Sequence, residues 1–258
     1  DYLAVGVDPK QVTLFKQSDV SEHTELAWIL DCLVTVPFLM QAHSYKDKVA
    51  KGLEANAGLF TYPMLMAADI LLYDTDVVPV GEDQRQHLEY AREAAAKFNH
   101  AWGDTMKEPK ELILKNVGVV PGTDGAKMSK SYKNTIPLVG TKDEMAKATM
   151  CIVTDSSSEV PTNVHAVHAL FRDTASLDQL YEEKKGKYKD LKEALIEDID
   201  AALAPMRERR AHITDDDVRT VLKAGAERAK EVAGAKMTDV RKKIGVTLKL
   251  CNEYSLAN

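Results

Sequence analysis

A short run of lysines and serines follows a glycine-rich turn near the middle of the sequence. Residues 121–125 read PGTDG, and 125–131 read GAKMSKS. The ammonium groups of Lys127 and Lys130, the serine hydroxyls and the loop N–H groups together form a donor set suited to a polyphosphate. A loop of this kind stabilises the charge that builds on departing pyrophosphate. The alternative is a solvated lysine-rich loop. The sequence has no Gly-x-x-x-x-Gly-Lys-Ser/Thr segment, which excludes a P-loop.

One carboxylate interrupts the longest apolar run of the chain, residues 63–73. A buried Asp69 would be costly unless paired, and a ligand N–H can be the partner, with Met66 as an adaptable apolar wall. Tyr62, Met66 and Asp69 are spaced i, i+4, i+7, so they share one helix face. The alternative is a structural aspartate paired with a lysine or arginine elsewhere.

A third candidate is the segment VVPVGEDQ at residues 77–84, which runs from a short β-branched stretch through a glycine into a helical pattern. Parallel α/β sheets bind ligands where a strand ends and the next helix begins. Gly81 permits close approach of a ligand, Asp83 can accept from ribose hydroxyls, and Gln84 can both donate and accept. Alternatively, Glu82 and Asp83 only complement the helix dipole.

The elements that position these residues follow from apolar spacing and capping residues. Strands are expected at 11–15, 77–80 and 117–120, a helix after residues 18–21, a helix beginning at Pro63, and another at 82–98. Residues 41–57 are expected to be a mobile segment or an exposed helix. After residue 138 strand signals nearly vanish, and helices are expected at 141–151, 163–171, 176–184, 187–210, 214–233 and 236–243. The pattern predicts an α/β part followed by an all-α part.

Composition narrows the class of protein. The 258 residues include 34 Lys+Arg and 40 Asp+Glu, a net charge of −6, with 45% hydrophobic and 29% charged residues. This is ordinary globular usage, and it argues against a protein that coats nucleic acid nonspecifically. No run has membrane-spanning length, and no signal-peptide pattern is present. Three well-separated cysteines exclude a disulfide scaffold and a four-cysteine metal cluster, and they suit the reducing cytoplasm.

Other candidates are weaker. His165 and His168 are three residues apart without an evident third metal ligand, so no metal site is expected. Basic runs at 184–187, 207–210 and 241–243 can meet RNA phosphates, but acidic residues dilute them and solvated faces are the alternative. The opening segment YLAVG is typical of the last turn of a helix. We therefore expect this sequence to be the remainder of a longer chain.

Taken together, three segments resemble one family. The KMSKS run at 127–131, AGLFTYPMLMAADILLY at 57–73 and DVVPVGEDQRQHLEYARE at 76–93 resemble the bacterial-type tryptophanyl-tRNA synthetases of class I. The likeness extends to VTDSS at 153–157 and GAERAKEVA at 225–233. It implies a Rossmann-like catalytic domain, incomplete at its N-terminus, over 1–138, with a connective insertion at about 33–75 and the KMSKS loop at 121–133. A helical anticodon-binding domain over 139–258 would follow.

The resemblance also implies residue roles. Asp69 would accept a hydrogen bond from the indole N–H, with Met66, Val78 and Val80 lining the pocket, and Tyr62 and Gln84 would hold the amino group. The implied ATP-binding residues are Gly81, Glu82, Asp83, Val119, Lys127, Met128, Ser129, Lys130 and Ser131. Of these, Lys127, Ser129 and Lys130 would be catalytic.

The implied reaction is attack of the tryptophan carboxylate on the α-phosphate of ATP, which gives tryptophanyl-adenylate and pyrophosphate. Transfer of the tryptophanyl group to tRNA(Trp) would follow. Catalysis would rest on positioning and charge stabilisation, with Mg²⁺ carried by ATP. The family implies a cytoplasmic homodimer, with its interface near residues 33–73.

Two departures from the family pattern matter. The other ATP signature, His-Ile-Gly-His or a Thr-x-Gly-Asn variant, is absent and would lie upstream of Asp1. A molecule that began at Asp1 is therefore expected to be inactive. The loop before Lys127 also reads VVPGTDGA rather than the longer ARIMSL form, so the adenine contact falls at Val119 or a neighbour.

Three alternatives to a tryptophan-specific ligase stay open at this point. A tyrosine-specific synthetase shares the architecture, and an aspartate on the specificity helix serves a phenol as well as an indole. A noncatalytic tRNA-binding remnant would bind RNA without nucleotide turnover. A small-molecule nucleotidyltransferase would not need the helical C-terminal half.

Overall fold

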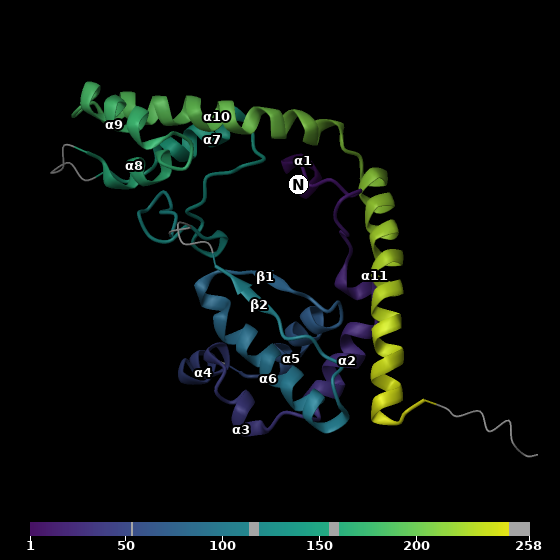
Figure 1. Ribbon diagram of the computed structural model, residues 1–258. Helices are drawn as coiled ribbons and strands as arrows, with labels where there is room; N and C mark the ends of the chain where they lie inside the picture. The colour runs from purple at the N-terminus through teal and green to yellow at the C-terminus, as the bar shows by residue number, and fades with distance from the viewer. Residues whose placement is uncertain (53, 114–118, 155–159, 248–258) are drawn as a thin grey trace, which may run out of the picture. The chain divides into compact units, whose positions relative to one another are not determined.

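The computed structural model describes residues 1–52, 54–113, 119–154 and 160–247 (Figure 1). The chain forms two compact units. The first unit comprises Asp1–Val12 and Asn116–Val218, and the second comprises Thr13–Lys115 and Arg219–Asn258. These units differ from the linear division at residue 138, because most of the last helix, α11 (Asp215–Ile244), packs with residues of the second unit.

The second unit contains a strand–helix–strand element. Strand β1 (Val77–Pro79) leads through a 3-10 turn, η2 (Glu82–Gln84), into α6 (Arg85–Trp102) and then β2 (Lys110–Leu112). The strands are parallel, with Val77 opposite Lys110 and Pro79 opposite Leu112. The predicted strand at 77–80 and helix at 82–98 are confirmed apart from their ends. A parallel pair joined by a helix is the repeating unit of α/β folds.

Two other strand predictions have different outcomes. Residues 117 and 118 of the predicted strand 117–120 lie outside the described residues, and Val119 and Val120 belong to no strand. Residues 11–15 form a turn followed by irregular chain, so that strand prediction is wrong. The main chain of Leu14 lies against Gly225 of α11 rather than beside a strand.

Helix α5 (Ala57–Leu71) packs between α2 (Glu22–Asp31) and α6 (Figure 1). Asn56 caps its start by accepting a hydrogen bond from the Leu59 N–H. Pro63 is therefore inside the helix rather than at its first position, which corrects the prediction. The proline removes one helical hydrogen bond, but Pro63, Met64 and Ala67 are all buried in the core, and tertiary packing outweighs the local cost.

The remaining helices of the second unit cover its sides. Pro37 lies in the first turn of α3 (Val36–Leu39), and α4 (His43–Ala50) is mostly exposed, as expected for this polar segment. Helix α11 is continuous, whereas the sequence predicted a break near Gly234. Ala229, Ala233, Met237 and Val240 of α11 are buried in the same core as α2, α5 and α6.

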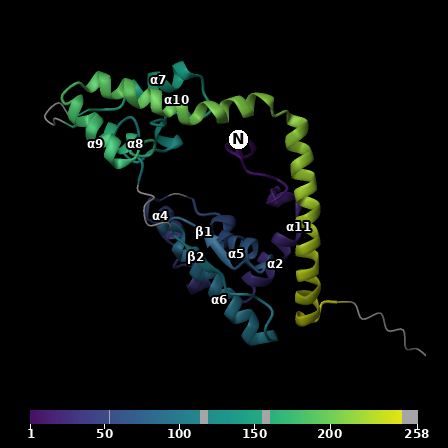
Figure 2. The same ribbon diagram turned by 45° about the horizontal axis from the view of Figure 1, so that its top comes forward.

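The first unit is helical. After α1 (Tyr2–Val5), which ends at a left-handed Gly6 as predicted, it contains α7 (Lys142–Met150), α8 (Thr162–His168), α9 (Thr174–Glu183) and α10 (Tyr188–His212). Figure 2 shows α7, α8 and α9 alongside α10. Thr141 and Glu144 form a reciprocal capping box at the start of α7. The predicted all-α character after residue 138 is confirmed for the described residues.

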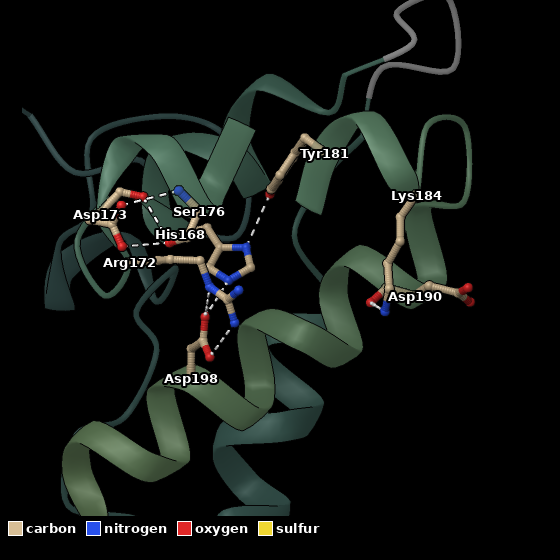
Figure 3. Close-up of polar contacts among 8 residues, drawn as sticks. All are labelled: His168, Arg172, Asp173, Ser176, Tyr181, Lys184, Asp190 and Asp198. Carbon is tan, nitrogen blue, oxygen red and sulfur yellow. Dashed lines mark hydrogen bonds and ion pairs between the residues drawn. The ribbon is translucent and has the colours of Figure 1, made fainter. Parts of the chain in front are cut away.

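A partly buried polar network joins three of these helices (Figure 3). His168 has no exposed surface, and its Nε2 lies 2.8 Å from Asp198 Oδ2. Arg172 donates two hydrogen bonds to the same carboxylate, at 2.7 and 2.9 Å. Tyr181 lies 3.3 Å from His168 Nδ1. Burial lowers the pKa of His168 below its usual 6.5, although Asp198 acts in the opposite direction. The network accounts for His168 as a structural residue that ties α8, α9 and α10 together.

Gly225 and Gly234 offer a matched test of helix packing. A Cβ at Gly225 would lie 1.9 Å from the Leu14 carbonyl oxygen, whereas one at Gly234 would meet nothing within 4 Å. We expect Gly225→Ala to lower the free energy of unfolding by roughly 1–3 kcal/mol. Gly234→Ala should raise it by about 0.5–1 kcal/mol, since alanine favours the helix. Urea unfolding of both variants checks this, and equal effects would contradict the packing.

His168 gives a pH prediction. Because its pKa is lowered in the folded chain, the unfolded chain binds more protons below pH 6.5, and acid then destabilises the folded state. We expect the free-energy gap between wild type and His168→Gln to shrink as the pH falls through 6.5. Glutamine keeps both hydrogen-bonding partners but does not titrate. Denaturant unfolding from pH 7.5 to 5.5 measures the gap, and a constant or growing gap would refute the prediction.

Candidate active site

A pocket of about 280 Å³ opens beside the carboxylate of Asp69 in the second unit. It is lined by Phe15, Gln17, His23, Asp69 and Tyr73. The side chain of Asp69 is 35% exposed, so it is not the fully buried charge that the apolar sequence suggests. Its partners in the described chain are polar and aromatic residues rather than the lysine or arginine considered from sequence.

Both oxygens of Asp69 are held by neighbours far away in the sequence. Gln17 Nε2 donates to Oδ1 and Oδ2, each at 2.8 Å, and His23 Nδ1 lies 2.6 Å from Oδ1. The second ring nitrogen of His23 lies 2.9 Å from the Tyr73 hydroxyl. Burial, with the nearby Asp69 charge, raises the pKa of Tyr73 to about 12, so the phenol keeps its proton at neutral pH. The carboxylate is thus fixed in orientation at the pocket wall.

Sequence reasoning missed these partners. His23 is buried on the same face of α2 as Leu26 and Leu30, with spacings of three and four residues. A histidine on an otherwise apolar stripe is a signal that could have indicated a paired, buried imidazole. Gln17 carries no such signal, because its place depends on the fold of the segment before α2.

The other residues predicted for tryptophan lie on α5 or between β1 and the turn η2, and they do not line this pocket. Met66, Val78 and Val80 are half-buried and pack on the core of the unit. The Tyr62 hydroxyl lies 2.6 Å from His87 Nε2, and burial lowers the pKa of that imidazole. Gln84 Nε2 donates to Asp83 at 3.0 Å. Their roles toward tryptophan stay predictions.

The predicted strand–glycine–helix junction is confirmed as local structure. Gly81 follows β1, and the turn Glu82–Gln84 opens α6. Glu82 receives two hydrogen bonds from Arg85, at 2.8 and 3.0 Å, which lower the pKa of this carboxyl. Glu82 is thus engaged in a local ion pair, whereas Asp83 bonds only the neighbouring Gln84 side chain among the described residues.

The lysine–serine segment in the first unit is the second arm of a tight hairpin. Pro121 pairs with Lys127 in an antiparallel bridge, and the Met128 N–H donates to the Val120 carbonyl at 2.9 Å. The turn between them closes through Gly122 N–H to Ala126 O and Gly125 N–H to Gly122 O. The predicted turn is confirmed, and it presents the segment in a fixed main-chain conformation.

The side chains of this hairpin divide into an anchored set and a free set. Met128 packs with Val120 against the core of α7, α8 and α10. Lys127 and Lys130 are exposed, and no carboxylate of the described chain lies within ion-pair distance of either. Ser129 caps the turn η3 (Lys130–Tyr132), and its hydroxyl lies 2.7 Å from that of Ser131. Val119 is 69% exposed. The two ammonium groups are therefore available to an anion.

Two of the basic runs prove to be engaged within the chain. Arg207 is paired with Asp200, and Arg209 donates to the Ala4 carbonyl at 2.8 Å. Arg210 bonds Asp1 at 2.7 Å. In the second unit, Arg241 donates to Glu25, which lowers the pKa of that carboxyl. Arg209 and Arg241 thus connect different helices, whereas the Arg207 pair lies within α10.

Comparison with known proteins gives a consistent result. Residues 1–211 match the family model described as tRNA synthetases class I (W and Y). A tryptophan–tRNA ligase of Fusobacterium nucleatum is 45% identical over 257 residues, which are 95% of this chain and 79% of that protein. One of Rhodopirellula baltica is 44% identical, over 95% of this chain and 80% of that protein.

Solved structures agree. The tryptophanyl-tRNA synthetase of Campylobacter jejuni complexed with ADP and tryptophan matches with a TM-score of 0.86 at 42% identity, over 95% of this chain and 80% of that one. The tyrosyl-tRNA synthetase of Aeropyrum pernix, at 18% identity and a TM-score of 0.59, shares the fold. From the family match and these relatives, the chain belongs to the class I tRNA synthetases for tryptophan and tyrosine.

Proposed function

We propose that this protein activates L-tryptophan with ATP to form tryptophanyl-adenylate and then transfers the tryptophanyl group to tRNA(Trp). The observation that carries the proposal is the Asp69 carboxylate, oriented by Gln17 and His23 at the wall of a small aromatic pocket. The relatives that match 95% of the chain at 41–45% identity are tryptophan–tRNA ligases, which supports the choice of amino acid.

In this proposal, Asp69 accepts a hydrogen bond from the indole N–H. A carboxylate already held by two donors presents its remaining lone pairs in a fixed direction, so little ordering is needed on binding. The family resemblance assigns Met66, Val78 and Val80 to the indole ring, and Tyr62 and Gln84 to the amino group, although none of the five lines the pocket beside Asp69. The Tyr73 hydroxyl keeps its proton at neutral pH, so it adds no charge of its own beside Asp69.

The chemistry needs no nucleophile from the protein. A tryptophan carboxylate oxygen bonds to the α-phosphorus, and the bond to the bridging oxygen of pyrophosphate breaks. Lys127 and Lys130 donate to the phosphate oxygens where charge accumulates, with the Ser129 hydroxyl as a further donor. Gly81, Glu82, Asp83, Val119, Met128 and Ser131 complete the ATP-binding set. Mg²⁺ bound to ATP would neutralise part of the phosphate charge.

The partners are proposed on separate grounds. The helical segments after residue 138 are assigned to tRNA(Trp) by the family resemblance. A homodimer is supported by an exposed apolar surface on α2 and α3, where Trp28 is 69% exposed and Val36 and Met40 are also exposed. Asp31 on α2 has a buried Oδ1 without a hydrogen-bond partner in the described chain, and burial raises its pKa to about 6.

Free, exposed thiols at Cys32 and Cys151 suit the reducing cytoplasm. The described residues contain no helix of membrane-spanning length and hydropathy.

Amino-acid-dependent exchange of ATP with labelled pyrophosphate tests the proposal on the protein at its natural full length. Exchange that depends on tryptophan is the expected result. Exchange that depends on tyrosine instead would show that the protein is a tyrosine-specific synthetase. Binding of tRNA without any exchange would indicate a noncatalytic remnant.

Lys130 tests the role of the lysine segment. We expect Lys130→Ala to lower kcat for adenylate formation on the order of 10²-fold, with tryptophan affinity nearly unchanged, because its charge acts mainly as pyrophosphate departs. Lys189→Ala is the control, since Lys189 is an exposed lysine of the same unit whose ammonium lies 3.6 Å from Glu193. Pre-steady-state adenylation and tryptophan binding measure the two effects. Equal losses in rate and affinity would argue against the role.

Asp69 tests the choice of amino acid. Asp69→Ala should weaken selection for tryptophan over phenylalanine by about 1–3 kcal/mol, the cost of leaving a polar group unpaired. Asp76→Ala serves as the control, because Asp76 is exposed and paired with Lys107. The ratio of kcat/KM values for the two amino acids measures selection, and an unchanged ratio would remove Asp69 from the binding pocket.

A further inference from the structure

A buried asparagine follows the lysine–serine segment by three residues. Asn134 is only 2% exposed, one of the few buried polar side chains in the described chain. Its Nδ2 donates to Asp124 Oδ1 at 2.7 Å and to the Lys127 carbonyl at 3.1 Å. Its Oδ1 accepts from the Ser129 N–H at 2.8 Å. Both amide hydrogens and the oxygen are thus used within one loop.

These bonds connect the turn of the hairpin to its second arm. Asp124 belongs to the turn, where its Oδ1 also accepts from the Ala126 N–H at 3.0 Å, while Lys127 and Ser129 belong to the lysine–serine arm. The Asn134 carbonyl accepts in addition from the Thr123 N–H at 2.9 Å. A single residue therefore fixes the turn and the following arm relative to each other.

Asn134 packs so closely against Gly122 that position 122 has no space for a side chain. A Cβ at Gly122 would lie 2.3 Å from the Asn134 side chain and 2.8 Å from its carbonyl oxygen. Glycine is needed here because of space, since its backbone must touch the asparagine. Gly122 and Asn134 are therefore packed directly against each other.

We infer that Asn134 is a positioning residue for the adenylation reaction: it holds the main chain from Asp124 to Ser129 rigid while leaving the Lys127 and Lys130 ammonium groups free. This inference rests on the proposed function, because it assigns the held loop to the ATP phosphates. Asn134 itself is buried beneath the loop and acts through it.

The energetic reason is preorganisation. Donors that are already in place when charge develops need no reorganisation, and a misplacement of about 1 Å costs on the order of 10²-fold in rate. Lysine side chains are flexible, so the position of their main chain limits where the ammonium groups can reach. Loss of the asparagine bonds frees the main chain at Lys127 and Ser129.

Asn134→Ala is compared with Asn99→Ala. Asn99 is a matched control in the other unit: its Oδ1 accepts from the N–H groups of Thr105 and Met106, and its Nδ2 donates to the Met106 carbonyl. Both variants lose three side-chain bonds that hold a loop. We expect Asn134→Ala to lower kcat for adenylation about 10²-fold with the KM for tryptophan unchanged, and Asn99→Ala to keep both.

A second readout does not depend on activity. Hydrogen exchange of the backbone amides at Met128 and Ser129 should be faster in Asn134→Ala than in wild type and unaltered in Asn99→Ala. Should wild type show no tryptophan-dependent exchange of pyrophosphate, the proposed function fails, yet the amide exchange still decides whether Asn134 holds the loop.

A charge swap covers the case in which Asn134→Ala does not fold. Asn134→Asp opposes the Asp124 carboxylate with a second one, and adding Asp124→Asn restores a hydrogen bond between the two positions. We expect the single change to slow adenylation and the double change to recover part of the rate. Normal kcat and normal amide exchange in the folded Asn134 variants, or no recovery in the double variant, would overturn the inference.

Discussion

The carboxylate of Asp69 is the interaction on which the account of specificity depends. It lies in a helix whose other residues are mainly apolar, and it is held by Gln17 and His23 from a segment about 50 positions earlier. These two partners fix the direction of the carboxylate, and the second ring nitrogen of His23 lies against the Tyr73 hydroxyl. An oriented anion in an aromatic pocket selects a ring with an N–H group.

The lysine–serine loop combines two opposite requirements. Charge stabilisation needs ammonium groups that reach a substrate, and preorganisation needs a main chain that does not move. The hairpin separates these tasks by residue: Met128 is anchored in the core of the first unit, Asn134 holds the turn to the second arm, and Lys127 and Lys130 are exposed. The motif therefore works only with the glycine-rich turn and the buried asparagine that flank it.

Local sequence patterns predicted many of the helices and strands, whereas tertiary contacts determined several of the site residues. Apolar spacing identified α2 and α6, and the strand–glycine junction was found from β-branched residues before Gly81. Pro63 was misplaced because packing of α5 outweighs a missing hydrogen bond. Asp69 stood out as a charge in an apolar run, but Gln17 and Asn134 did not, since their hydrogen-bond partners are set by the fold.

The most direct test compares tryptophan with 1-methyltryptophan, which lacks the indole N–H. Adenylate formation by the protein at its natural full length gives kcat/KM for each. If Asp69 accepts that hydrogen, wild type should prefer tryptophan by about 1–3 kcal/mol beyond any preference shown by Asp69→Ala. The same ratio in both proteins would contradict the account, because the carboxylate would then not read the ring nitrogen.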